Sequence, residues 1–211
     1  MPAASARTAF SRITARSPTS PKPTSSSARA KRYAADPARP VLDLPPSPAL
    51  SIVQNGPKGF KGRKLGVLVS DGTDAALLGA LESATESAGG LIELVAPQVN
   101  GFRTSDGSLR PAKQKINGGP SVLYDAVAIL VSAGGAALLG SEATARDFVA
   151  DAFAHATFIG FVNAAKSLLD KAGIAPDGGC LALAAPVDAQ RLVTMCGDVR
   201  FWQREKSVHA V

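Results

Sequence analysis

The sequence contains few of the residues that most catalytic and metal sites require. It has two cysteines, Cys180 and Cys196, and two histidines, His155 and His209, in 211 residues. Two cysteines are too few for a disulfide framework, which weakly favours a reducing compartment. No Ser-His-Asp or Cys-His spacing emerges, and neither histidine lies in a Cys/His cluster, so we expect no metal site.

Long apolar runs are also missing. Hydrophobic residues make up 45% of the chain, yet no run approaches the roughly 18 residues that span a bilayer. We therefore expect a soluble, cytoplasmic protein with no membrane partner. The length is enough for one sizeable domain, or for one domain with a tail.

Acidic residues are absent from the first 35 positions, and the charge is unevenly distributed. Residues 1–60 have a net charge of +7, whereas residues 61–211 have a net charge of −1. The isoelectric point of about 9.6 therefore reflects the N-terminal part. A nearly neutral remainder argues against a nucleic-acid partner.

The tail over 1–35 is rich in Ser, Thr, Pro, Ala and Arg. We expect it to be disordered, because it cannot bury enough apolar surface to offset the entropy of ordering. A plain extension is favoured over an organelle transit peptide, because prolines at 18, 21 and 23 interrupt an amphipathic helix. A nucleic-acid-binding arm is less favoured still, since no interleaved aromatic residues are present to stack on bases.

The remaining chain divides into three segments: a Pro-rich connector over 36–62, an α/β domain over 63–206 and a short tail over 207–211. Apolar runs predict strands at 64–70, 91–97, 125–132, 158–162 and 180–184. Helices are predicted at 75–88, 142–155, 163–169 and 187–195, with caps at Thr73 or Asp74 and at Asn163. The Asp-Gly turn at 105–108 predicts a hairpin, and Ala-Gly-Gly at 133–135 predicts a loop.

Strands that are almost entirely apolar and alternate with helices predict a mainly parallel sheet covered on both faces. The fold class is a flavodoxin-like three-layer α/β/α sandwich. Ligands of such folds bind beyond the carboxyl ends of the strands. The candidate crevice residues there are Asp71, Asp74, Ser132, Gly134 and Gly135.

Each of these residues also has a plain structural explanation. Asp71 and Asp74 are explained by an Asp-Gly turn with a helix cap, and Gly134-Gly135 by a turn. The strand-to-helix corner in FIGFVNAAKSLL (158–169) holds Val162, where hydrolases often place a nucleophile. Cys180 and Cys196 are expected to be buried structural cysteines.

Several segments carry a family resemblance: DLPPSPALSIV (43–53), FKGRKLGVLVSDGTDAALLGAL (60–81), INGGPSVLYDAVAILVS (116–132), DFVADAFAHATFIGF (147–161) and RFWQRE (200–205). In this order they resemble the C-terminal domain of large-subunit haem catalases, over about residues 36–206. The resemblance implies a flavodoxin-like fold, related to class I glutamine amidotransferases and PfpI-type peptidases. Hydrolases of that superfamily place a cysteine where Val162 or Asn163 stands here and a glutamate where Leu77 stands.

The resemblance therefore implies a vestigial corner and no catalytic or cofactor-binding residue in this chain. The family's role is hydrogen peroxide decomposition in oxidative-stress defence, with haem held by the parent catalase. We expect a free-standing or fragmentary C-terminal domain that acts in stability, assembly or chaperone-like function. Its expected partner is a catalase haem core or a second copy of the chain. The alternative is a PfpI-like hydrolase or deglycase that uses Cys180 or Cys196.

Overall fold

A six-stranded sheet forms the centre of the described part of this computed structural model, residues 39–40 and 42–208. The strands are all parallel and lie in the order β5–β2–β1–β6–β7–β8. They are β1 Lys64–Val69, β2 Leu91–Ala96, β5 Gln114–Lys115, β6 Ala126–Leu130, β7 Phe158–Phe161 and β8 Cys180–Ala182. The two-residue strand β5 was not predicted, and the tail over 1–35 lies outside the described residues.

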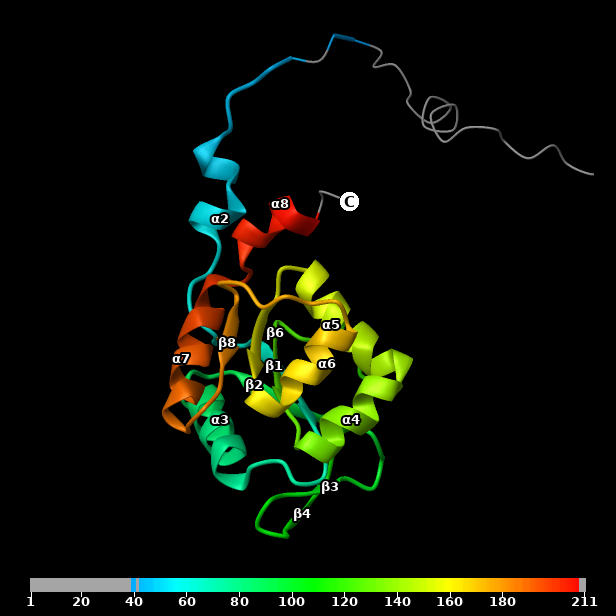
Figure 1. The fold of residues 1–211 in the computed structure, drawn as a ribbon. Coiled ribbons are helices and arrows are strands. Elements are labelled where there is room, and N and C mark those ends of the chain that lie inside the picture. The colour runs from blue at the N-terminus through cyan, green and yellow to red at the C-terminus, as the bar shows by residue number, and fades with distance from the viewer. Residues whose placement is uncertain (1–38, 41, 209–211) are drawn as a thin grey trace, which may run out of the picture. The chain divides into compact units, whose positions relative to one another are not determined.

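Helices cover both faces of the sheet. Helices α3 Ala75–Ser87 and α7 Val187–Met195 pack on one face, and α4 Ala133–Ser141, α5 Ala143–Ala154 and α6 Lys166–Lys171 pack on the other (Figure 1). This arrangement confirms the predicted three-layer sandwich. None of the helices in the described residues is long and apolar enough to cross a membrane.

Short elements complete the described chain. They are η1 Pro48–Leu50, α2 Ile52–Asn55, η2 Ser121–Leu123, η3 Asn163–Ala165, η4 Cys196–Asp198, η5 Trp202–Arg204 and α8 Glu205–Val208. The predicted hairpin is also present, with β3 Phe102–Arg103 antiparallel to β4 Leu109–Arg110. The Asp-Gly turn predicted at 105–108 connects these two strands.

Two local predictions about helix starts were wrong. The loop predicted over 133–135 is the first turn of α4, because the hydroxyl of Ser132 accepts a hydrogen bond from the Gly135 N–H at 3.1 Å and caps the helix. The cap predicted at Asn163 is absent, since η3 begins there without a side-chain cap. The cap at Asp74 is confirmed, with its carboxylate accepting from the Leu77 N–H at 2.8 Å.

A tyrosine ring lies directly on a glycine in the central strand. Tyr124 follows η2 and is only 2% exposed, and a β-carbon added at Gly66 in β1 would overlap its ring. Burial raises the pKa of the Tyr124 phenol to about 12. The absence of a side chain at Gly66 is therefore required by close packing between two layers.

Candidate functional site

The order of the strands reverses between β1 and β6, because the chain runs from β1 outwards to β2 and β5 before it returns to β6. Ligands of open α/β sheets bind at such a switch point, beyond the carboxyl ends of the strands. The loops after β1 and β6 line a pocket of about 280 Å³ there. This pocket brings together four of the five predicted crevice residues, Asp71, Ser132, Gly134 and Gly135. Asp74 is not among its lining residues.

The polar side chains of this crevice hold its loops together. The Ser132 hydroxyl donates to the Asp71 carbonyl at 2.6 Å, and the Ser132 N–H donates to the hydroxyl of Ser70 at 3.1 Å. The Asp71 carboxylate accepts from the Arg103 N–H at 2.7 Å, which ties the β3–β4 hairpin to the β1–α3 loop. These bonds give Asp71 and Ser132 a structural role in the positions of the loops.

The two glycines of the crevice differ in their surroundings. A β-carbon at Gly135 would overlap the side chain of the buried Ser70, whereas a β-carbon at Gly134 would meet no atom within 4 Å. Close packing between α4 and the end of β1 therefore accounts for Gly135. Gly134 is exposed and lines the open pocket.

The strand-to-helix corner after β7 carries hydrocarbon side chains. Val162 is half-buried and packs against the apolar cores on both sides of the sheet. Its φ of −80° and ψ of 158° are those of ordinary extended backbone. The nucleophile of an α/β hydrolase sits instead on a strained turn. Leu77 is 5% exposed and belongs to the core, while Asn163 is exposed. Neither Val162 nor Leu77 can attack a carbonyl or accept a proton.

Both cysteine thiols are protonated at neutral pH. Cys180 lies in the edge strand β8, and burial raises its pKa to about 11, although the Arg204 guanidinium 3.6 Å from its sulfur opposes the shift. Cys196 is 2% exposed at the end of α7, and burial raises its pKa to about 12. A nucleophilic cysteine has a lowered pKa. The ring of His155 contacts the Asp151 carbonyl on α5, and His209 lies outside the described residues.

A buried arginine that sequence reasoning did not single out anchors the last described segment. Arg204 is 1% exposed, and its Nε and Nη2 donate to the two carboxylate oxygens of Asp177, each at 2.7 Å. Its Nη1 donates to the Thr157 carbonyl at 2.8 Å, and its guanidinium lies 4.1 Å from the ring centroid of Phe153. Burial raises the pKa of Asp177, but the hydrogen bonds from Arg204 and the Gly179 N–H, together with the charge of Arg204, outweigh burial and leave that pKa below its usual value.

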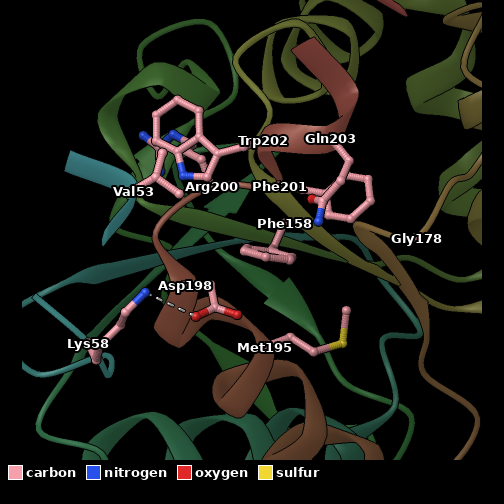
Figure 2. Close-up of a pocket in the computed structure, with 10 residues that line it drawn as sticks. All are labelled: Val53, Lys58, Phe158, Gly178, Met195, Asp198, Arg200, Phe201, Trp202 and Gln203. Atoms are coloured by element: carbon pink, nitrogen blue, oxygen red, sulfur yellow. Dashed lines mark ion pairs between the residues drawn. The ribbon is translucent and has the colours of Figure 1, made fainter. Parts of the chain in front are cut away.

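A second and larger pocket lies at the opposite edge of the sheet, beside the first residue of β7, Phe158 (Figure 2). Its volume is about 430 Å³, and its lining includes Trp202 and Arg200 from the C-terminal part of the chain. Sequence reasoning missed it, because its lining residues are far apart in the sequence. The one available signal was the chain's only tryptophan, between aromatic and basic residues in RFWQRE.

The sheet order, the two helical layers and the corner define a flavodoxin-like domain of the kind found in DJ-1 and PfpI-like proteins. The fold is similar to that of Drosophila melanogaster DJ-1beta, with a TM-score of 0.57 and 13% identity, over 70% of this chain and 95% of that one. A two-domain Anabaena variabilis protein with DJ-1/ThiJ/PfpI-like and ferritin-like domains also has a similar fold, with a TM-score of 0.55 and 14% identity. The similarity covers 63% of this chain and 48% of that one. At these identities the likeness concerns the fold alone.

Sequence comparison identifies the family. Residues 61–206 match the C-terminal domain found in long catalases, and the chain belongs to that family. It is 54% identical over 168 residues to Catalase C of Rhizobium meliloti (strain 1021), covering 79% of this chain and 24% of that protein. It is 28% identical to Catalase HPII of Pseudomonas putida, and the similarity covers 80% of this chain and 23% of that protein. The chain therefore spans about a quarter of the length of these curated relatives.

The catalase family implies haem, and the described residues do not fit a haem site. Tyr124 is fixed against Gly66 and lines neither the crevice nor the larger pocket. Tyr33 lies outside the described residues. Within 39–40 and 42–208, no group of three or more His, Cys, Asp and Glu side chains is placed to hold a metal ion. Haem iron in catalases is held by a tyrosine, and neither pocket presents one.

Proposed function

We propose that this chain acts as a non-catalytic C-terminal module of a long catalase, with a role in stability, assembly or chaperone-like protection. Peroxide decomposition would then belong to the haem-containing part of such a catalase. The observation that carries the proposal is the match of residues 61–206 to the family, over only about a quarter of the length of the long relatives.

The chemistry of the corner supports a non-catalytic role. The nucleophile position is occupied by Val162 or by the exposed Asn163, and the position of the expected proton acceptor is occupied by the buried Leu77. The alternative, a PfpI-like hydrolase or deglycase, would need Cys180 or Cys196 as an activated thiolate. The raised pKa values of both thiols argue against that alternative.

The connector supplies the best candidate contact for a partner. Four of its large apolar side chains are strongly exposed, namely Leu42 (74%), Leu44 (73%), Leu50 (86%) and Ile52 (68%). Exposed apolar residues that follow one another along a segment are typical of an interaction site. We propose that this segment packs against the haem core of a long catalase, and a second copy of this chain is the other occupant to be tested.

The proposal can be tested with a long catalase whose C-terminal domain has been removed, such as that of Rhizobium meliloti. The purified chain, added in trans, should lengthen the thermal half-life of the truncated catalase and co-elute with it in size-exclusion chromatography. Ile52→Asp should abolish both effects, while Val187→Asp, at an equally exposed position of α7 (68%), should leave them unchanged. If the chain instead elutes as a dimer, separately from the truncated catalase, the second copy is the partner.

Two results would overturn the proposal. One is a truncated catalase whose thermal half-life is unchanged at any molar ratio of added chain, and which does not co-elute with the chain. The other is peroxide decomposition by the chain itself, together with a stoichiometric Soret band after incubation with haem.

A further inference from the structure

The pocket at the amino ends of the strands has the dimensions of a ligand site. Its volume of about 430 Å³ lies within the range of roughly 300–1,000 Å³ that small-molecule sites occupy. Its walls come from α2, the start of β7, the end of α7 and the turn between η4 and η5 (Figure 2). Several elements therefore converge on one cavity, at the edge of the sheet opposite the crevice.

Aromatic and sulfur-containing side chains form much of its surface. The rings of Phe158 and Phe201 meet edge to face with centroids 6.2 Å apart, and Met195 and Trp202 line the same cavity. Trp202 is 37% exposed although it is a large apolar side chain. Rings held in fixed positions favour a flat aromatic ligand, which can stack on or against them.

The charged groups of the pocket leave one cation available to a ligand. Lys58 and Asp198 form an ion pair at 3.7 Å and largely neutralise each other (Figure 2). Arg200 has no carboxylate partner among the described residues. Its Nη1 donates to the carbonyls of Asp125 and Val199, at 2.8 and 2.9 Å, so the guanidinium is held in place. A fixed guanidinium favours an anionic group such as a carboxylate.

A strained backbone turn positions this arginine. Val199 has a φ of 69° and a ψ of −59°, and the Arg200 N–H donates to the Asp198 carbonyl at 2.8 Å. These values describe a γ-turn of the rare, strained kind. A β-branched residue with positive φ is a clear outlier, and such outliers cluster at functional sites. The strain therefore falls in the wall of this pocket, between Asp198 and Arg200.

We propose that this pocket binds a flat aromatic molecule that carries a carboxylate. The ring would lie among Phe158, Phe201 and Trp202, and the carboxylate would accept hydrogen bonds from Arg200. The inference rests on this cavity alone, so its failure would leave the proposed role in a long catalase unaffected.

The only tryptophan of the chain lines the pocket and provides a direct assay. The full chain would be titrated with 4-ethylbenzoate and with its uncharged isostere 4-ethylbenzamide, with binding followed by Trp202 fluorescence. A charge-assisted hydrogen bond should make the carboxylate bind at least about tenfold more tightly than the amide. The affinity of the carboxylate alone should fall as salt is added, because salt screens its attraction to the guanidinium.

Arg200→Gln should reduce the preference for the carboxylate to about twofold or less and leave the amide affinity nearly unchanged. Arg191→Gln is the matched control, because Arg191 lies on the exposed side of α7 and does not line the pocket. Equal affinities for the two probes, or no saturable change at millimolar concentrations, would refute the proposal. If Arg200→Gln fails to fold, the comparison of the probes and the salt dependence of the unaltered chain still decide the question.

Discussion

Substituting the two neighbouring glycines of α4 by alanine should have opposite effects on stability. Gly134→Ala adds a methyl group in open space and removes backbone freedom from the unfolded chain, so we expect a gain of up to about 0.5 kcal/mol. Gly135→Ala forces the new methyl group onto Ser70, which is 2% exposed. Overpacking of this kind costs about 1–3 kcal/mol.

The Gly135→Ala change should also disturb the hydrogen bond from the Ser132 N–H to the Ser70 hydroxyl, which adds about 1 kcal/mol. The expected loss is about 2–4 kcal/mol, which corresponds to a fall in Tm of roughly 4–16 °C for a chain of this size. Thermal and urea unfolding followed by far-UV circular dichroism would measure both variants. Equal stability of Gly134→Ala and Gly135→Ala would refute the packing explanation of Gly135.

Three further predictions concern the charged and thiol groups. Arg204→Met should cost about 2–4 kcal/mol in the free energy of unfolding, because Asp177 and the Thr157 carbonyl lose their partner. If the stability losses of Arg204→Met and Asp177→Asn simply add in the double variant, this explanation is wrong. The lowered pKa of Asp177 means that its stabilising contribution is present above about pH 4 and is lost as the pH falls further, so the acid sensitivity of unfolding should decrease in Asp177→Asn. A thiol-reactive disulfide at neutral pH should label Cys180 slowly and Cys196 only after unfolding, whereas rapid labelling of the folded chain would favour the hydrolase alternative.

The strands of the central sheet could be predicted because they are buried on both faces. The run KLGVLV, for example, has no polar residue after its first position, which is typical of a central parallel strand. The start of α4 could not be predicted, because two glycines disfavour a helix locally, and only Gly135 is explained, by its packing on Ser70 in the folded chain. The two-residue strand β5 carries too little pattern to be recognised.

Of the two candidate sites, only the crevice could be predicted from the sequence. Asp71 and Ser132 could be predicted to lie close together, because both directly follow strands whose carboxyl ends share one edge of the sheet. The pocket around Phe158 could not be predicted, because its walls include Val53 and Trp202, which are separated by most of the chain and meet only through tertiary packing. The strain at Val199 carries no sequence signal at all, since valine is an unfavourable residue for that backbone conformation.

The contact between Gly66 and Tyr124 has a consequence for how the sheet assembles. In the native register Leu65 pairs with Ala126 and Gly66 with Val127, and the Tyr124 ring occupies the space that only a glycine leaves free. A slip of β1 by one residue would bring Leu65 or Val67 under the ring, and either side chain would collide with it. The Gly66–Tyr124 contact therefore penalises pairings of the two central strands that are shifted by one residue, and it favours the native register.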